Sequence, residues 1–161
     1  MFDFDVRGVS ELEEVRPDAM YALGMVHLGA RIGEVARGPA VTFAVETSVG
    51  GAIDALNRSA RGAAVVLRNQ RPVGVVTSQD LLAHDGRDLS VVTLMTACRE
   101  PLRTDDTVGE ALRRMCSMRL WHLPIVCARG LLVGSIDIAD LTLWLRDRMT
   151  LLSVDAALGT S

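Results

Sequence analysis

A short motif occurs twice in this chain, and its repetition constrains the fold more than any other feature. The first copy reads Gly74-Val75-Val76-Thr77-Ser78-Gln79-Asp80-Leu81, and the second reads Gly134-Ser135-Ile136-Asp137-Ile138-Ala139-Asp140-Leu141. Each copy begins as an apolar run that is typical of a strand and continues with polar residues that favour a helix start. Gly74, Asp80 and Leu81 have the same spacing as Gly134, Asp140 and Leu141, so we expect an internal duplication.

Further pairs align the two copies along most of the chain. An offset of 59 residues matches the first helices, and one extra residue near Gly130 changes the offset to 60 for the later elements. Seven pairs fall in register on this basis: Val49 with Val108, Gly50 with Gly109, Ala52 with Ala111, Val73 with Val133, Gly74 with Gly134, Asp80 with Asp140, and Leu81 with Leu141.

The pattern of apolar and capping residues predicts the same element order in both copies, namely strand, helix, strand, strand, helix. Ser48 and Thr107 are expected to cap the first helices, Thr77 or Ser78 to cap the second helix of copy one, and Asp137 to cap that of copy two. The predicted organisation is a helical N-terminal extension at 1–31, a first repeat at 32–85, a linker at 86–91, a second repeat at 92–148 and a flexible tail at 149–161.

Composition narrows the class of protein. The 161 residues carry a net charge of −3 without a Lys/Arg block, which argues against nucleic-acid binding. Apolar residues make up 49%, enough for a core, but no run reaches the roughly 18 residues of a membrane span. Three cysteines without a CxxC pair and an acidic N-terminus without a signal-peptide pattern favour a cytoplasmic location.

The duplicated motif and element order resemble the CBS domain (the cystathionine β-synthase repeat) in tandem, the arrangement called a CBS pair or Bateman module. The run Arg119-Leu120-Trp121-His122-Leu123-Pro124-Ile125-Val126 is similar to the basic-Leu-Pro-Val strand of that family. The resemblance implies an α+β fold with pseudo-twofold symmetry and two three-stranded sheets packed side by side. It also implies a regulatory module that binds an adenosine-containing ligand between the copies.

The residues themselves fit such a ligand. The Asp80 carboxylate can accept hydrogen bonds from both hydroxyls of a ribose, as acidic residues do in dinucleotide-binding folds. Thr77 and Ser78, at the start of the same helix, offer hydroxyl and N–H donors for a phosphate. The same residue types are also ordinary choices for a helix cap, which gives a purely structural interpretation.

The resemblance adds residues of the opposite copy to this site. Arg119 and His122 hold the positions from which the family brings positive charge to the phosphates, and Ala63, Val75 and Leu102 are candidates to contact the adenine. AMP, ADP or ATP is the expected ligand, and no further cofactor is required.

The second cleft departs from this pattern. Asp140 retains the carboxylate for a ribose, but Asp137 stands at the phosphate position, where its charge would repel a phosphate by about 1–4 kcal/mol. Ala60 and Ala63 occupy the positions that correspond to Arg119 and His122, so the basic side chains are missing. We therefore expect the second cleft to bind an adenosine moiety more weakly.

Three other functions remain open. An enzyme is disfavoured because no nucleophile lies in an activating context, and a metal site formed by Cys116, His122 and Cys127 matches no usual zinc spacing. A ligand-free scaffold for dimerisation and protein interaction is the main alternative. A homodimer is expected in either case, with an apolar face that includes Leu141, Trp144 and Leu145, and with a regulated partner protein that is unknown.

Overall fold

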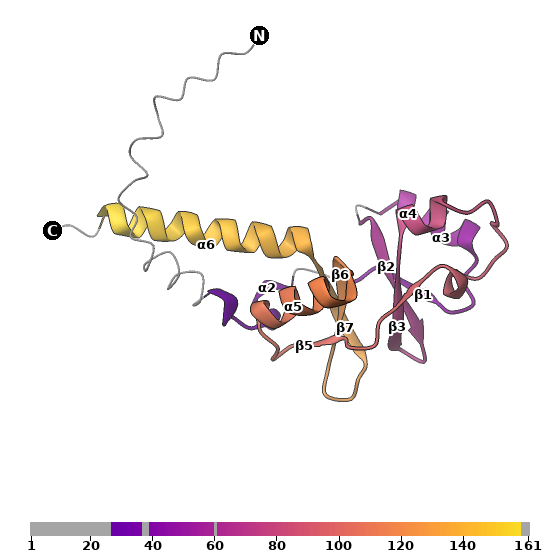
Figure 1. Ribbon diagram of the computed structural model, residues 1–161, viewed down its shortest axis with the longest axis horizontal. Helices are drawn as coiled ribbons and strands as arrows, with labels where there is room; N and C mark the ends of the chain where they lie inside the picture. The colour runs from indigo at the N-terminus through magenta and orange to yellow at the C-terminus, as the bar shows by residue number, and fades with distance from the viewer. Residues whose placement is uncertain (1–26, 37–38, 60, 159–161) are drawn as a thin grey trace, which may run out of the picture.

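The computed structural model of the chain describes residues 27–36, 39–59 and 61–158, with the backbone alone for 149–158. Two small sheets flanked by helices form an α+β fold, and the last helix extends well beyond them (Figure 1). In chain order the elements are α2 (Ile32–Val35), β1 (Thr42–Ala44), α3 (Val49–Asn57), β2 (Ala63–Arg68), β3 (Arg71–Thr77), α4 (Ser78–Leu82), the 3₁₀ helix η2 (Val91–Thr93), β4 (Thr96–Ala97), β5 (Leu102–Arg103), α5 (Val108–Met118), β6 (His122–Val126), β7 (Leu132–Asp137) and α6 (Ile138–Leu158).

The two sheets have matching topologies. In the first, β1 pairs parallel to β2, and β2 pairs antiparallel to β3. In the second, β5, β6 and β7 repeat this arrangement. The first sheet also gains β4, which pairs antiparallel to β3, so it has four strands where three were expected. This strand comes from the segment that we assigned to the second repeat.

Strand register confirms the internal duplication. Gly74 lies opposite Val66 in the first sheet, and Gly134 lies opposite Ile125 in the second, each beside an irregularity in the pairing. The offset is therefore 59 residues for β2 and β6 but 60 for β3 and β7. The sequence alignment of the two copies predicted this change of offset.

The extra residue lies in the second hairpin, as expected. In the first hairpin, Asn69 and Gln70 both adopt positive φ angles, which suits a two-residue turn. In the second, the Cys127 amide donates to the Leu131 carbonyl across a longer turn in which Gly130 has a φ of 75°. Only glycine adopts this left-handed conformation without a steric cost.

The segment that precedes each repeat packs on the other repeat. The Ile32 amide donates to the Asp106 carbonyl at 2.8 Å, and the Val91 amide donates to the Thr47 carbonyl at 2.9 Å. These four residues are equivalent at the offset of 59. Figure 1 shows the consequence: α2, which opens the first repeat, lies beside α5 of the second.

The same segments complete the starts of the longer helices. The Val49 amide, at the start of α3, donates to the Leu89 carbonyl at 2.8 Å, and the Val108 amide, at the start of α5, donates to the Ala30 carbonyl at 2.9 Å. The first amides of a helix have no partner within it, so these bonds satisfy groups that would otherwise need water.

The exchange also builds the two cores. Ile32 and Val35 are fully buried in a cluster with Leu102, Met115 and other residues of the second repeat. Val91 is fully buried in the other cluster, which consists of residues from α3, α4 and the first sheet. Each core therefore includes residues from the segment that precedes the other repeat.

Leu141 and Trp144 belong to this interior and not to an exposed face. Their exposed fractions are 0% and 4%, and Leu145 packs against the same core. These three residues therefore do not form the apolar face that we expected them to offer to a second copy. Exposed apolar side chains instead include Leu82 on α4 and Leu143 on α6.

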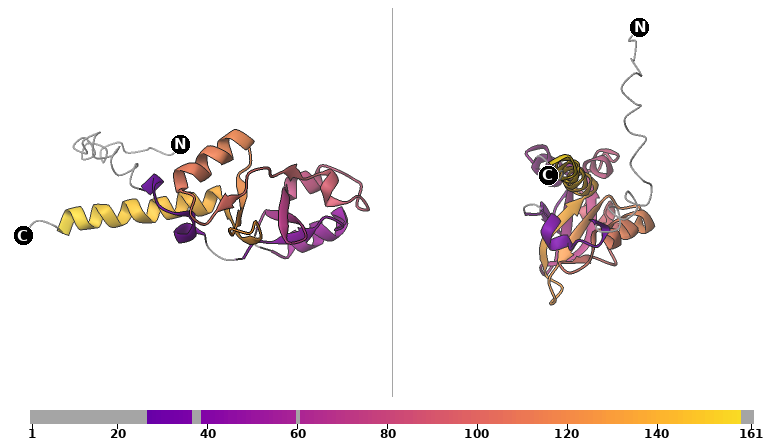
Figure 2. Two further views of the ribbon diagram at one scale, coloured as in Figure 1. Left: turned by 90° about the horizontal axis from the view of Figure 1, so that it is seen from below. Right: turned by 90° about the vertical axis from the view of Figure 1, so that its left-hand side faces the viewer.

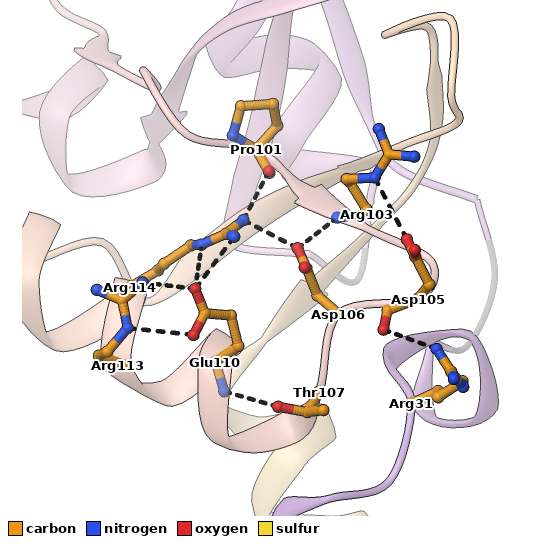
Figure 3. Close-up of polar contacts among 9 residues, drawn as sticks. All are labelled: Arg31, Pro101, Arg103, Asp105, Asp106, Thr107, Glu110, Arg113 and Arg114. Atoms are coloured by element: carbon orange, nitrogen blue, oxygen red, sulfur yellow. Dashed lines mark hydrogen bonds and ion pairs between the residues drawn. The ribbon is translucent and has the colours of Figure 1, made fainter.

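An arginine-centred network fixes the start of the second repeat (Figure 3). Arg114 of α5 is 3.0 Å from the Asp106 carboxylate and donates to the Pro101 carbonyl at 2.8 Å. It also contacts Glu110, one turn earlier on α5. Arg31 donates to the Asp105 carbonyl, which ties the exchanged segment to this loop. The corresponding position in the first repeat is Ala55, so only one repeat has this network.

The C-terminal end of the chain differs from the predicted organisation, and most of the predicted N-terminal extension lies outside the described residues. Helix α6 continues to Leu158, so the expected tail at 149–161 is helical for most of its length (Figure 2). Residues 1–26 of the predicted extension lie outside the described residues. His27 packs edge-on against Trp144 with ring centroids 5.9 Å apart, as a packing residue would. None of the helices that the structure describes combines the length and apolar character needed to span a membrane.

Gly74 provides a test of the added strand. A Cβ atom there would lie 2.9 Å from the Thr96 carbonyl oxygen and 2.5 Å from Met95 Sδ, closer than side chains tolerate. Gly74→Ala should therefore destabilise the protein by about 1–3 kcal/mol in urea unfolding. Gly62→Ala is the control, because a Cβ atom at that position would have no neighbour within 4 Å. It should change stability by less than about 0.5 kcal/mol. Equal stabilities for the two variants would contradict the β3–β4 pairing.

Candidate functional site

Thr77, Ser78 and Asp80 lie together where β3 runs into α4, and we call them the first site. The Asp80 amide donates to Thr77 Oγ1 at 3.1 Å, while the Thr77 amide donates to Asp80 Oδ2 at 2.8 Å. The Thr77 hydroxyl also donates to Asp80 Oδ2 at 2.7 Å. This is a reciprocal capping box, so the structural interpretation of these residues is correct as far as it goes.

Two polar groups of the first site are not used by this cap. Among the described residues, neither the Ser78 hydroxyl nor Oδ1 of Asp80 has a hydrogen-bond partner, and both residues are partly exposed. Helix α4 has only five residues, so its dipole contributes less to anion binding than that of a longer helix. Ligand binding here would depend on the side chains.

The apolar residues predicted to contact an adenine are packed inside the protein. Ala63 pairs with Thr77 across the first sheet and is 6% exposed, while Val75 and Leu102 are 1% and 0% exposed. All three belong to the core cluster that the second repeat shares with Ile32. They come together as predicted, but as core residues.

Arg119 ends helix α5 in a left-handed conformation with a φ of 52°. Its amide and that of Leu120 bond back to carbonyls of the last helical turn, which closes the helix as a glycine usually does. The Arg119 side chain is exposed. No hydrogen bond or ion pair joins it to Asp80 in the described part of the chain.

A second site forms around Asp137 and Asp140, at the junction of β7 and α6. The Asp140 amide donates to Asp137 Oδ1 at 2.7 Å, so Asp137 caps α6 as expected. The guanidinium of Arg61 also reaches this site from the first repeat. Its Nη1 atom lies 3.0 Å from Asp140 Oδ2 and 3.3 Å from Asp137 Oδ2.

The prediction that no basic residue stands opposite the second site is therefore wrong. Arg61 comes two residues before β2 and is one position out of register with Arg119, whose strict counterpart is residue 60. The offset of 59 pairs Arg119 with residue 60 and therefore does not point to Arg61. From a position one residue out of register, just before the strand, the arginine side chain still reaches both carboxylates. The hydrogen bond to Asp140 raises the pKa of Arg61.

His122 belongs to the second site and not to the first. It pairs with Asp137 at the end of the β6–β7 hairpin, is 7% exposed, and its Nε2 lies 3.1 Å from Ser135 Oγ. Burial lowers its pKa below the ordinary 6.5, the charge of Asp137 opposes that shift, and the charge of Arg61 reinforces it. A neutral, buried imidazole cannot supply the positive charge that we assigned to it at the first site.

Trp121 is a second residue that sequence reasoning missed. Its carbonyl accepts from the Ile138 amide at the start of α6, and its side chain is 58% exposed beside the second site. Its counterpart in the first repeat is Gly62, whose carbonyl accepts from Ser78 in the same way. A tryptophan that interrupts an otherwise duplicated pattern is the signal that could have drawn attention to it.

The other candidate residues are dispersed. Cys116 is exposed on α5, Cys127 lies in the second hairpin, and His122 is buried, so the structure does not assemble them into a metal site. Among the described residues no group of three His, Cys, Asp or Glu side chains is arranged to hold a metal ion. A cavity of about 280 Å³ between the β4–β5 connection and α5 includes none of the predicted site residues; it is lined by Ala97, Arg99, Glu100, Ser117 and Met118.

The lowered pKa of His122 predicts a specific pH dependence. Between its folded and unfolded pKa values the unfolded chain binds the proton and the folded chain does not, so stability falls as the pH drops below about 6.5. His122→Gln removes this contribution and should lose less stability than the wild type between about pH 8 and pH 5.5 in urea unfolding. His84→Gln replaces an exposed histidine and serves as the control for the substitution. Parallel curves for the wild type and His122→Gln would contradict this assignment.

Comparison with known proteins agrees with the fold and the duplication. Residues 32–86 match the family model described as CBS domain. The CBS domain of a CBS domain containing membrane protein from Sphaerobacter thermophilus superimposes with a TM-score of 0.67, at 20% identity over 78% of this chain and 93% of that one. A CBS domain protein from Pyrobaculum aerophilum complexed with AMP gives 0.64, at 23% identity over 73% and 99%.

A third structure carries different ligands. The CBS domain pair of protein MJ0100, in complex with 5′-methylthioadenosine and S-adenosyl-L-methionine, gives a TM-score of 0.66 at 18% identity over 74% of this chain and 98% of that one. At these identities the likeness shows the fold. Residues 32–86 match the CBS domain model, and the chain has the fold of a tandem CBS domain pair.

Proposed function

We propose that this chain is a regulatory module that binds an adenosine-containing nucleotide of the AMP, ADP or ATP class and signals that state to a partner protein. The observation that carries the proposal is the ligand content of the similar structures. A CBS domain protein of the same fold is complexed with AMP, and a CBS domain pair is complexed with 5′-methylthioadenosine and S-adenosyl-L-methionine. All three ligands contain adenosine.

The first site has the chemistry for the polar part of such a ligand. Oδ1 of Asp80 is an acceptor for ribose hydroxyls, and the Ser78 hydroxyl is a donor for a phosphate oxygen. Asp80 meets no basic side chain within hydrogen-bond or ion-pair distance in the described part of the chain, so a ligand need not displace one. Arg119, exposed on the opposite repeat, is the cation proposed to approach the phosphate, whereas His122 no longer has that role.

The second site is less suited to a phosphorylated ligand. Asp137 and Asp140 carry two negative charges against the single positive charge of Arg61, and His122 beside them is neutral because burial lowers its pKa. A phosphate placed there meets net repulsion. We therefore propose one nucleotide site per chain, formed by Thr77, Ser78 and Asp80, with Ala63, Val75 and Leu102 bordering the region where the adenine would lie.

A ligand-free scaffold is the alternative, and one observation favours it. Thr77 and Asp80 satisfy each other as a helix cap, and Val75 and Leu102 are buried without a ligand. The first site is therefore stable as it stands. Thermal-shift measurements with AMP, ADP and ATP distinguish the two functions, because a ligand that binds only the folded state raises the melting temperature.

A homodimer is also proposed, although the residues first assigned to its interface are in the core. Leu82 on α4 and Leu143 on α6 are 69% and 45% exposed, and each lies on the last helix of its repeat. Multi-angle light scattering at micromolar concentration should give about twice the 17.4 kDa mass of one chain. A mass near that of one chain would contradict the dimer.

Substitution of the two equivalent aspartates tests the proposed nucleotide site. Asp80→Asn keeps an oxygen for the helix cap but loses the negative charge, and hydrogen bonds to a charged group contribute about 1.5–3 kcal/mol each. It should weaken AMP binding about tenfold or more in isothermal titration, while Asp140→Asn changes it little. Melting curves without ligand show whether either variant is merely less stable.

The same titrations can overturn the assignment. Two equal AMP sites per chain, or a larger loss from Asp140→Asn than from Asp80→Asn, would reverse the roles of the two sites. If AMP, ADP and ATP all fail to bind at millimolar concentration, the scaffold function replaces the proposal.

A further inference from the structure

The contact of Arg61 with Asp137 and Asp140 joins the two repeats at the second site. Both ion pairs end on the same Nη1 atom, and the three side chains are only 15–26% exposed. Asp140 Oδ2 also accepts from the Asp137 amide at 3.3 Å. One carboxylate oxygen thus receives a guanidinium from the first repeat and a backbone amide from its own repeat.

The first site has no counterpart of this contact among the described residues. At the offset of 59 residues Arg61 corresponds to Leu120, which is 6% exposed and packs in the core of the second repeat. Oδ2 of Asp80 accepts from Thr77, through its amide and its hydroxyl. The two sites therefore present equivalent aspartates with different partners: Asp80 is bonded within its own helix cap, and Asp140 is also bound to an arginine of the other repeat.

The guanidinium uses the group that a ribose would need. Asp140 is the equivalent of Asp80, and its Oδ2 is taken by Arg61. A neutral ribose hydroxyl that bonds to the Asp140 carboxylate competes with the charged guanidinium for it. Once Arg61 leaves, Asp137 and Asp140 remain as two partly buried carboxylates, which favours an uncharged adenosine over any phosphorylated form.

We propose that Arg61 is a built-in occupant of the second site, so that a ligand at Asp140 and the Arg61 contact between the repeats exclude each other. This inference rests on one part of the proposed function, namely that this fold binds adenosine-containing ligands, because it assumes that Asp140 can bind a ribose. Binding at the second site then breaks an ion-pair contact between the repeats. The apparent affinity for the ligand is lowered by the fraction of molecules in which Arg61 is bound.

The test isolates the second site and removes its occupant. In an Asp80→Asn background, adenosine and AMP are titrated calorimetrically against the full chain with Arg61 intact, with Arg61→Gln and with Arg58→Gln. Arg58 is an exposed arginine at the end of α3 and serves as the matched control. Arg61→Gln should bind adenosine about tenfold more tightly than the parent, Arg58→Gln should match the parent, and AMP should stay weak in all three.

Two results would overturn the inference. If Arg61→Gln binds adenosine no better than the parent, the guanidinium does not compete with a ligand. If Arg61→Gln binds AMP less tightly than the parent, Arg61 contacts the phosphate and assists binding. Trp121 fluorescence gives a separate readout at the second site, because its exposed ring lies beside the start of α6 while Trp144 is 4% exposed in the core.

A second variant keeps the test valid if Arg61→Gln proves unstable. Asp137→Asn removes one of the two charges that hold Arg61 but leaves an oxygen to cap α6 and leaves Asp140 unchanged. It should also tighten adenosine binding in the Asp80→Asn background, and an unchanged or weaker affinity would count against the inference.

These experiments test the proposed function and the inference about Arg61 independently of each other. AMP titration of the chain with Asp80 intact tests the first site alone. If that titration shows no binding while Arg61→Gln binds adenosine, the proposed nucleotide site is wrong and the inference holds. If AMP binds at Asp80 but adenosine affinity is independent of Arg61, only the inference falls.

Discussion

The reciprocal exchange of two short segments is the contact on which the rest of this structure depends. The Ile32 amide is bonded to Asp106 of the second repeat, and the Val91 amide is bonded to Thr47 of the first. Each segment also caps the first helix of the repeat that receives it and fills its core with buried aliphatic side chains. A single repeat would lack both contributions, and small cores have little stability to spare. Each repeat thus receives a segment from the other. These backbone contacts fix the position of one carboxylate site relative to the other without a ligand or an ion pair.

Within this symmetric frame, single substitutions make the two sites different. Thr77 and Asp137 cap equivalent helices, but one is a neutral hydroxyl and the other a carboxylate. Arg61 reaches the second site from a position where the opposite repeat has the buried Leu120. The additional negative charge of Asp137 and the positive charge of Arg61 compensate each other. Without Asp137 the guanidinium would lose one carboxylate partner, and without Arg61 two partly buried carboxylates would lack a cation. The second site is therefore an internal ion-pair contact, and the first is the place proposed for a nucleotide.

The sequence predicts the backbone of this protein better than its sites. The alignment of Gly74 with Gly134 correctly predicted both hairpins, and the change of offset predicted the extra residue in the second hairpin. Such predictions succeed because strand and turn patterns depend on residues that are close in the sequence. The exchange of α2 and η2 was not predicted, since both segments are too short to show periodicity and their partners are distant in the chain. Arg61 was missed because it is one residue out of register, and His122 was assigned to the wrong site because the side of a strand on which a buried histidine finds its partner depends on tertiary packing. Trp144 was taken for an exposed interface residue, although a long apolar helix face can equally pack inside its own chain.

The two equivalent aspartates have opposite roles in the proposed mechanism, Asp80 for a ligand and Asp140 for Arg61. A crystal structure of the wild-type protein grown with AMP tests this asymmetry most directly. We expect one AMP per chain, with its ribose on Asp80, its phosphate near Ser78, and the Arg61 guanidinium still bound to Asp137 and Asp140. An AMP molecule whose ribose lies on Asp140 and whose phosphate is bound by Arg61, with Asp80 still bonded only to Thr77, would contradict it.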